Sequence, residues 1–227
     1  NRFGLPLGTF LFLFTFDFNS YAPRKNPEAV IEAYRRALDG DGSSPAMDGR
    51  PVGLVLKMHG GGYDPADRAA LESYRSTIAG LYVIDETLAR EELTQLQSAS
   101  DAFVSLHRSE GFGLALAEMM ALGKPVIGTD WSATAEFLDP TTGCPVRCEL
   151  IRLERNVGPY TAGQTWADPD VDHASAWMRQ LAADPDLCRS IGERARERIQ
   201  RDYAPEVIGE AYRSRIKSIA LFSRNRQ

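Results

Sequence analysis

The run TFLFLFTF, residues 9–16, constrains the fold of this chain more than any other stretch. It is continuously apolar, whereas a strand with one face in water alternates between apolar and polar residues. It is also far shorter than the roughly 20 residues that a helix needs to cross a bilayer. No basic segment precedes it and no cleavage site follows it, so it is not a signal peptide. We therefore expect a strand that is covered on both faces, as in a parallel sheet.

More short apolar runs follow the first, and helical patterns separate them. Each run has the length of one strand, and each intervening stretch has room for one helix. Strands that alternate with helices predict right-handed βαβ units and hence an α/β fold, a Rossmann-like doubly wound parallel sheet with helices on both faces. The further predicted strands are Val52–His59, Leu81–Asp85, Ala102–Leu106 and Pro125–Thr129, and predicted helices include Asp64–Ala79, Glu91–Ala99, Val171–Ala183, Pro185–Arg201 and Pro205–Leu221.

Polar residues mark where several helices are expected to begin. Asn26 is predicted to cap a helix over residues 27–38, and Ser132 to cap the helix that follows it. Asp168-Pro169-Asp170 and Asp184-Pro185-Asp186 match an Asp-x-Asp pattern that elsewhere holds a metal and a diphosphate. Because each precedes a helical run, we expect the first aspartate to be an N-cap and the proline to occupy the first helical position.

Two regions are predicted to be loops. Residues 39–51 are polar and rich in Gly, Pro and Asp. Residues 139–168 are irregular apart from Pro145–Leu153, and a loop of this length is more often functional than inert. We expect Tyr160 and Trp166 to pack this second loop against the domain, with stacking on a substrate as the alternative.

The stretch EGFGLALAE, residues 110–118, carries the clearest chemical signal. Gly111, Phe112 and Gly113 stand between an apolar strand and a helix that starts near Leu114. Free amides at a helix N-terminus attract anions, and glycines let a phosphate approach the backbone, so a diphosphate site is expected here. The flanking carboxylates, Glu110 and Glu118, suit the hydroxyl groups of a ribose or a sugar, which points to a nucleotide sugar. The alternative is a tight turn with a solvated glutamate on each side.

Two cations, Arg24 and Lys25, follow the first strand. The carboxyl ends of the strands in an open α/β sheet form the crevice where ligands bind. Arg24 and Lys25 are therefore expected to lie beside the glycine turn of residues 111–113. The alternative is an ordinary pair of surface cations.

Composition limits the classes of function. A net charge of −5 and a pI near 5.3 argue against a nucleic-acid partner. The segment 194–226 is locally basic, which indicates a solvated helix face or, alternatively, contact with an anionic membrane surface. The cysteines are too few for a disulfide framework, so we expect reduced thiols and a cytoplasmic location. The three histidines, His59, His107 and His173, form no recognisable metal motif.

Residues 105–129, SLHRSEGFGLALAEMMALGKPVIGT, strongly resemble the Glu-x7-Glu region of the retaining glycosyltransferases of family 4, which have the GT-B fold. Residues 16–38 resemble the first strand-loop-helix of the donor domain of that family, and residues 83–106 resemble its nucleotide-base loop and the next helix. Residues 158–174 are similar to a subset that works on bacterial surface polysaccharides such as lipopolysaccharide, often with mannose or rhamnose donors.

This resemblance implies that residues 1–227 are the nucleotide-sugar (donor) binding domain, the C-terminal half of a GT-B glycosyltransferase. The family carries its acceptor site on an N-terminal domain, and nothing in this chain resembles one. Because the chain begins at Asn1 and not at methionine, we expect an upstream segment to be missing. The full protein is then expected to transfer a hexose, and this chain alone to be inactive or nearly so.

The resemblance also implies roles for individual residues. Lys25 matches a lysine that contacts the donor diphosphate and neutralises the leaving group. The family often has an arginine about five residues earlier; here that place holds Ser20 or a neighbour, and Arg24 is expected to substitute. The remaining expected contacts are the base against the backbone of Ile84 and Asp85 and against Leu88, the diphosphate on the amides of Gly111, Phe112, Gly113 and Leu114, the ribose hydroxyls on Glu118, the sugar hydroxyls on Glu110, and the sugar or acceptor near His107 and Arg108.

Retention of configuration has two routes. One is a double displacement with a carboxylate nucleophile. The family is generally thought to react on one face instead, with the leaving phosphate assisting the acceptor, so we expect Glu110 to position the sugar and stabilise charge. Neither a cofactor nor a divalent metal is expected to be required.

Two other classes of function stay open. A nucleotide-sugar epimerase shares this architecture but needs acid and base residues that the sequence does not display. A donor-binding module without catalysis describes the fragment itself. The base can be uridine, guanosine or deoxythymidine, and the acceptor a glycan or a lipid-linked sugar. We expect work in the cytoplasm, with the inner face of the membrane as the alternative location.

Overall fold

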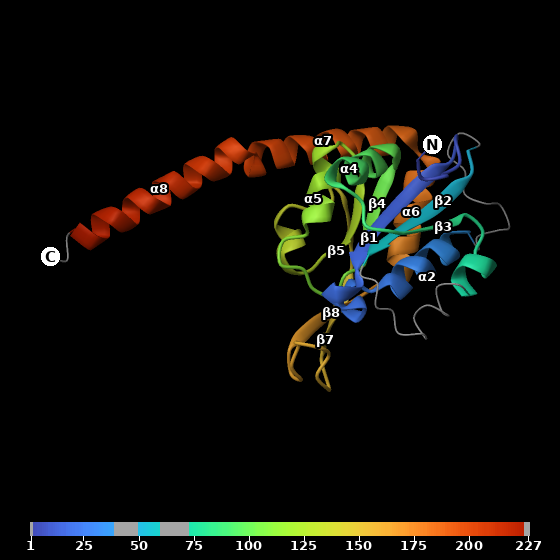
Figure 1. The fold of residues 1–227 in the computed structure, drawn as a ribbon, viewed down its shortest axis with the longest axis horizontal. Coiled ribbons are helices and arrows are strands. Elements are labelled where there is room, and N and C mark those ends of the chain that lie inside the picture. Colours follow the sequence, from blue (N-terminus) through green and yellow to red (C-terminus); the bar gives the residue numbers. More distant parts are fainter. Residues whose placement is uncertain (1, 39–49, 60–72, 225–227) are drawn as a thin grey trace.

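The computed structural model describes residues 2–38, 50–59 and 73–224. Its centre is a parallel sheet of six strands in the order β3-β2-β1-β4-β5-β6 (Figure 1), as the sequence predicts. The strands are β1 (Phe10–Asp17), β2 (Val52–His59), β3 (Leu81–Asp85), β4 (Ala102–Ser105), β5 (Val126–Thr129) and β6 (Cys144–Val146).

Helices cover both faces of the sheet. One face packs against α2 and α6, and the other against α4 and α5, while α7 contributes to both hydrophobic cores. The helices are α1 (Ala22–Lys25), α2 (Pro27–Leu38), α4 (Arg90–Ala99), α5 (Leu114–Ala121), α6 (Val171–Ala183), α7 (Pro185–Tyr203) and α8 (Pro205–Arg224), with short 3₁₀ turns η1 (Phe18–Ser20) and η2 (Ser132–Glu136). The chain is also helical at residues 73–77; the predicted loop 39–49 and the predicted helix before residue 73 lie outside the described residues.

The two cores explain why β1 is continuously apolar. Phe12 and Phe14 belong to the core under α2 and α6, whereas Leu11 and Leu13 belong to the core on the opposite face. Successive side chains of a strand point to opposite faces, so a strand covered on both sides needs an apolar residue at every position. All four of these side chains are at most 4% exposed.

The order of the strands places a switch point between β1 and β4. From β1 the chain adds β2 and β3 on one side, and then returns to add β4, β5 and β6 on the other. Ligands of open α/β sheets bind outside the carboxyl ends of the strands at such a point. The turn that carries Arg24 and Lys25 follows β1, and the turn that carries Glu110 follows β4.

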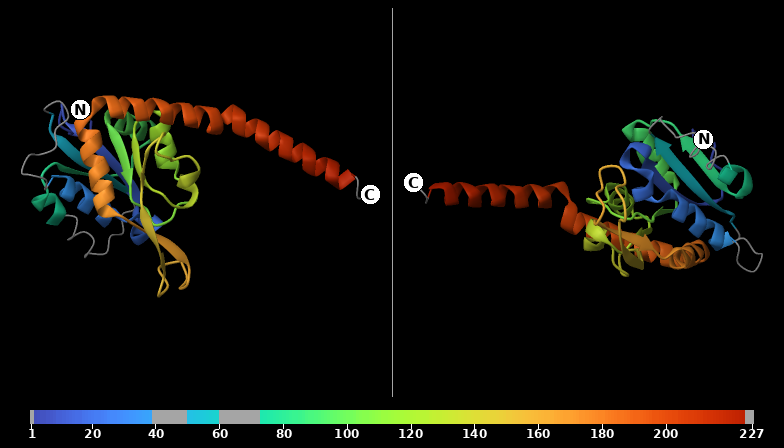
Figure 2. Two further views of the ribbon diagram at one scale, coloured as in Figure 1. Left: turned by 180° about the vertical axis from the view of Figure 1, so that it is seen from behind. Right: turned by 90° about the horizontal axis from the view of Figure 1, so that it is seen from below.

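A two-stranded antiparallel arm projects from the domain near this edge (Figures 1 and 2). It consists of β7 (Cys148–Arg152), β8 (Thr165–Pro169) and the residues between them. The prediction that 139–168 is irregular outside 145–153 is wrong for β8, because a hairpin with a connection this long carries no local turn signal. Tyr160 packs on Trp166 with ring centroids 5.2 Å apart, and Trp166 is buried, so the predicted packing of these rings is confirmed.

The two Asp-Pro-Asp sequences behave differently. Asp184 caps α7 as predicted, and its carboxylate accepts the Leu187 amide at 2.9 Å. The same prediction for Asp168 is wrong. Asp168 lies in β8, and Asp170 caps α6 by accepting the His173 amide at 2.9 Å. Strand pairing with β7 continues through Pro169, so the helix starts two residues later than the proline alone indicates.

The C-terminal helix α8 extends away from the domain (Figures 1 and 2). Its exposed apolar residues include Tyr212, Ile216 and Ile219. In α7, the basic residues are not merely solvated: Arg194, Arg196 and Arg198 donate to the backbone carbonyls of Thr141, Leu122 and Glu136. Within the described residues, no helix is long and apolar enough to cross a membrane. All three cysteines are free thiols, as expected.

Candidate functional site

A tight cationic turn follows β1. Tyr21 precedes α1 with a positive φ of 63°, and Asn26 ends α1 in the left-handed conformation with φ 57°. The side-chain amide of Asn26 donates to the Leu106 carbonyl at 3.0 Å. The prediction that Asn26 caps α2 is therefore wrong, because its side chain instead ties the turn to the end of β4. The start of α2 at Pro27 agrees with the prediction.

The turn brings two cations to one carboxylate. Lys25 donates to Oε1 of Glu110, and a guanidinium nitrogen of Arg24 lies 3.4 Å from Oε2. The same nitrogen of Arg24 donates to the Ser109 carbonyl at 2.6 Å. All three charged side chains are less than 20% exposed. Two cations and one anion leave a net positive charge in a sheltered place at the switch point of the sheet.

Ionisation of Glu110 follows from these neighbours. Burial by itself raises the pKa of the Glu110 carboxyl, but the charges of Lys25 and Arg24 and the hydrogen bond from Lys25 outweigh burial and lower the pKa below its ordinary value. Glu110 is therefore a carboxylate at neutral pH. It can accept hydrogen bonds from hydroxyl groups, but it cannot donate a proton.

The glycine turn between β4 and α5 has the predicted place and shape. Gly113 precedes α5 with φ 87°, and a Cβ at this position would lie 2.5 Å from Cγ2 of Thr134, so only glycine fits. Around the Cβ position of Gly111 there is open space. Phe112 packs outward on the rings of Phe137 and Tyr203 at 5.5 and 5.6 Å, which anchors the turn. Amides of the first turn of α5, which begins at an exposed Leu114, have no partner within the helix.

A second turn, η2, supports Glu110 from below. The Ser132 hydroxyl accepts the backbone N–H of Glu110 at 3.0 Å, and Ser132 itself has a positive φ of 66°. The prediction that Ser132 caps a helix is wrong: residue 131 precedes η2, and the Ser132 side chain makes no cap. A hydroxyl that holds a backbone amide from another turn has no local sequence signature.

His107 lies inside the domain. Its Nδ1 is 3.2 Å from the Ser105 hydroxyl, and its Nε2 is 3.1 Å from the Thr134 hydroxyl. The side chain is fully buried, and burial lowers its pKa to about 4, so the ring is neutral at pH 7. It joins β4 to η2 beneath the glycine turn.

Arg108 faces the arm. One guanidinium nitrogen donates to the Asp168 carboxylate at 2.5 Å and to the Ala167 carbonyl at 3.3 Å. The backbone N–H of Arg108 donates to the Arg24 carbonyl at 2.8 Å. Asp168, which the sequence indicated only as a cap, is thus the partner of a predicted site residue.

Glu118 is held by the helix that follows the predicted base loop. Arg90, the first residue of α4, donates to one carboxylate oxygen at 2.7 Å, and Gln97 donates to the other at 2.8 Å. Among the predicted base contacts, Ile84 and Leu88 pack in the same core, and Asp85 ends β3. Arg90 and Gln97 had no distinguishing motif in the sequence. The structure therefore joins Glu118 to the base loop through α4, and Glu110 to the cations of α1.

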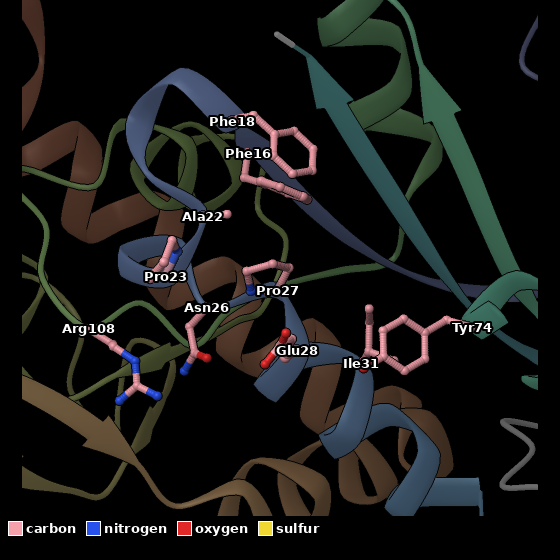
Figure 3. Close-up of a pocket in the computed structure, with 10 residues that line it drawn as sticks. All are labelled: Phe16, Phe18, Ala22, Pro23, Asn26, Pro27, Glu28, Ile31, Tyr74 and Arg108. Carbon is pink, nitrogen blue, oxygen red and sulfur yellow. The ribbon is translucent and has the colours of Figure 1, made fainter. Parts of the chain in front are cut away.

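A separate cavity of about 280 Å³ borders α1 on the side of α2 (Figure 3). Arg108 lies at one end and Tyr74 at the other, with Phe16 and Phe18 above. Ala22 and Pro23 line it, whereas Lys25 and Glu110 do not, so the cavity is distinct from the charged cluster. Over the described ranges, no group of three or more His, Cys, Asp or Glu side chains is arranged to hold a metal ion.

The fold and this edge define a class of protein. The six-stranded parallel sheet covered by helices is the Rossmann-like fold of GT-B glycosyltransferase structures. TarM from S. aureus, solved with Fondaparinux, alpha-GlcNAc-glycerol and UDP, superposes with a TM-score of 0.65 at 17% identity over 93% of this chain and 36% of TarM. The C-terminal domain of the glycosyl transferase group 1 family protein LpcC from Francisella tularensis gives 0.64 at 17% identity over 88% of this chain and 89% of that domain.

The chain belongs to the family of glycosyl transferases group 1, which it matches over residues 15–151. It is 32% identical to N-acetyl-alpha-D-glucosaminyl L-malate synthase of Bacillus anthracis over 139 residues, which are 60% of this chain and 31% of that protein. It is 30% identical to D-inositol 3-phosphate glycosyltransferase of Nocardiopsis dassonvillei over 196 residues, 84% of this chain and 42% of that protein. The match thus spans less than half of either relative.

Proposed function

We propose that this chain is the donor-binding half of a retaining, family 4 glycosyltransferase of the GT-B type. The observation that carries the proposal is the sheltered cluster of Arg24, Lys25 and Glu110 at the switch point, beside the glycine turn at the start of α5. A net positive cluster next to free helix amides suits a diphosphate. A carboxylate in the same cluster suits the hydroxyl groups of the attached sugar.

Each part of the donor then has a partner. The diphosphate lies on the amides of residues 111–114, and Lys25 and Arg24 balance its charge. The ribose hydroxyls donate to Glu118. The base lies against Leu88 and the backbone of residues 84–85. In TarM the nucleotide in the solved complex is UDP, which supports a nucleoside diphosphate as the ligand class.

The reaction breaks the bond between the anomeric carbon and the diphosphate oxygen and forms a bond from the same face to an acceptor hydroxyl oxygen. The proton of that hydroxyl passes to the departing phosphate oxygen. Lys25 and Arg24 stabilise the negative charge that builds on the diphosphate, so the chain's own cations can supply the charge that a divalent metal supplies elsewhere. Glu110 holds the sugar hydroxyls and orients the anomeric carbon. Because its pKa is lowered, Glu110 stays ionised during this step.

For His107 we propose a positioning role in place of a direct sugar contact. Its ring is buried and both of its nitrogens have hydroxyl partners, so it fixes η2, and through Ser132 the backbone of Glu110. Arg108 remains a candidate for contact with the sugar or the acceptor, since its guanidinium is 23% exposed at the edge of the site.

The physiological role that we propose is hexose transfer to a glycan or lipid-linked acceptor in the synthesis of a bacterial surface polysaccharide. The acceptor would bind between this chain and a separate N-terminal domain. The relatives transfer, by their names, N-acetylglucosaminyl and glycosyl groups to small hydroxylated acceptors, which supports sugar transfer in general. Residues 158–174 carry the likeness to the polysaccharide subset.

A second candidate function, donor binding without transfer, is favoured by one observation. The chain corresponds to 31% and 42% of its relatives, and it covers most of a structure that is itself a C-terminal domain. In this case the chain binds the nucleotide sugar but transfers nothing unless another domain supplies the acceptor.

The test is calorimetric titration of the chain with UDP, GDP and dTDP and their sugars, without added metal. We expect one nucleotide to bind in the micromolar to millimolar range, and Lys25→Ala and Glu118→Ala each to weaken that binding. Lys217→Ala and Glu206→Ala, which remove the same charges from exposed positions on α8, are the matched controls and leave the affinity unchanged. Absence of binding by every nucleotide, or equal effects of the site and control variants, contradicts the donor assignment.

A further inference from the structure

The arm formed by β7, β8 and residues 153–164 is joined to the cationic turn by two separate chains of contacts. The first is a chain of backbone hydrogen bonds. The N–H of Ala167 in β8 donates to the Arg108 carbonyl at 2.9 Å, and the N–H of Arg108 donates to the Arg24 carbonyl at 2.8 Å. Through Arg108, the backbone of the arm is thus only two hydrogen bonds away from a predicted diphosphate-binding residue.

The second chain is aromatic. Trp166 in β8 packs edge-on against Tyr160 with ring centroids 5.2 Å apart, and Tyr160 packs edge-on against Tyr21 at 5.9 Å. Gly158 lies against the Tyr21 ring so closely that a Cβ on Gly158 would stand 1.9 Å from a ring carbon. The arm loop therefore encloses the ring of Tyr21 from two sides.

The backbone of Tyr21 explains why this enclosure matters. Tyr21 adopts φ 63° and ψ 99°, a conformation that a bulky residue avoids unless its surroundings impose it. The Tyr21 carbonyl accepts the N–H groups of Arg24 and Lys25 at 3.0 and 3.3 Å. The direction of that carbonyl, which φ and ψ of Tyr21 set, therefore fixes where α1 begins and where its two cations point.

We propose that Tyr21 is a positioning residue, and that the arm, through Gly158 and Tyr160, holds Tyr21 so that Arg24 and Lys25 are aligned on Glu110. The proposal rests on the proposed function only in naming the ligand, a diphosphate, that the aligned cations receive. Tyr21 acts on that ligand through Arg24 and Lys25. A merely structural role for the arm predicts that displacing the Tyr21 ring changes stability and leaves the charged cluster intact.

The test compares two glycines of the arm loop. Gly158→Ala drives a methyl group into the Tyr21 ring, whereas Gly163→Ala has the same disadvantage of a positive φ, 89° against 54°, with nothing within 4 Å of its Cβ. The first readout is the pKa of Glu110, followed by NMR of its labelled carboxyl carbon without any ligand. The second is the dissociation constant of the nucleotide that the wild-type chain binds. Thermal unfolding confirms that each variant is folded.

We expect Gly158→Ala to raise the Glu110 pKa and to weaken nucleotide binding about tenfold, since one charge-assisted contact loses its alignment. Gly163→Ala is expected to change neither. Tyr21→Phe keeps the ring and should behave as wild type, while Tyr21→Ala should reproduce the effect of Gly158→Ala. If Gly158→Ala does not fold, Tyr160→Leu replaces it, because it removes the aromatic contact without a clash.

The two readouts separate this proposal from the donor assignment. Equal Glu110 pKa values in the Gly158→Ala, Tyr160→Leu and wild-type chains overturn the positioning role, whatever the nucleotide data show. A raised Glu110 pKa in a chain that binds no nucleotide at all upholds the positioning role and sinks the donor assignment. A raised pKa together with weakened binding supports both.

Discussion

Lys25 and Glu110, 85 residues apart in the chain, form an ion pair that joins the turn after β1 to the turn after β4. Their side chains are 19% and 10% exposed, so water screens the pair only partly. Arg24 adds a second cation at 3.4 Å from the other carboxylate oxygen. The carboxylate therefore neutralises one of two cations that an anionic ligand would otherwise meet in full.

Replacing that carboxylate by an amide should strengthen the binding of a bare diphosphate. Glu110→Gln removes the one negative charge of the cluster, so we expect inorganic pyrophosphate to bind several-fold more tightly. The free energy of unfolding should fall by about 2 kcal/mol, because two sheltered cations lose their counter-ion. Calorimetry and urea unfolding measure the two effects. Glu28→Gln, an exposed carboxylate at the start of α2, is the control. Unchanged or weaker pyrophosphate binding means that Lys25 does not face the anion.

The two glycines of the turn should respond differently to alanine. Gly113→Ala places a methyl group 2.5 Å from Thr134 at a positive φ, and we expect a loss of about 2 kcal/mol in unfolding free energy. Gly111→Ala has open space and should cost less than about 0.5 kcal/mol, yet its methyl group stands where a phosphate must approach. Urea unfolding and nucleotide titration check this pair. A Gly111→Ala chain that binds nucleotide as well as wild type contradicts the predicted phosphate path.

Burial pattern made the sheet predictable from the sequence. The uninterrupted run in β1 requires cover on both faces, and the two cores on either side of Phe12 and Leu13 supply it. By contrast β8 could not be predicted, because it pairs with β7 across a long connection and contains no strand-like alternation. Asp168 was misread for the same reason: a local cap rule cannot register a partner strand.

The site was predictable to the extent that chain direction decides it. Residues that follow β1 and β4 must meet at the switch point, and Lys25 and Glu110 do. The contacts that support them depend on side chains from other turns. Ser132 accepts the Glu110 amide, and Arg90 reaches Glu118 from α4, and neither residue belongs to a motif. Asn26 shows the limit of local rules, since a good N-cap residue makes a long-range bond instead.

His107 should make stability depend on pH. Its pKa is about 4 in the folded chain against 6.5 when exposed, because burial disfavours the charged ring. The unfolded chain therefore binds more protons between these values. The His107 contribution to stability is complete above pH 6.5 and falls as the pH drops towards 4, with a slope of up to about 1.4 kcal/mol per pH unit. Urea unfolding from pH 7 to 5 measures this slope. His107→Gln should reduce the slope, and His59→Gln should not; equal slopes in all three chains contradict the buried, neutral ring.

Glu118 should discriminate between ligands that have a ribose and ligands that do not. Glu118→Gln keeps the shape of the side chain but weakens its acceptance of hydroxyl protons, so we expect about tenfold weaker binding of the preferred nucleotide and unchanged binding of pyrophosphate. Stability should change by less than about 1 kcal/mol, because its partner Arg90 is 64% exposed. Arg90→Ala is the matched control: it removes the partner and leaves the carboxylate to the ribose, so nucleotide affinity should hold or improve. Calorimetry with both ligands decides the matter. An equal loss for nucleotide and pyrophosphate in Glu118→Gln would mean that this carboxylate shapes the phosphate site through α5 and does not touch the ribose.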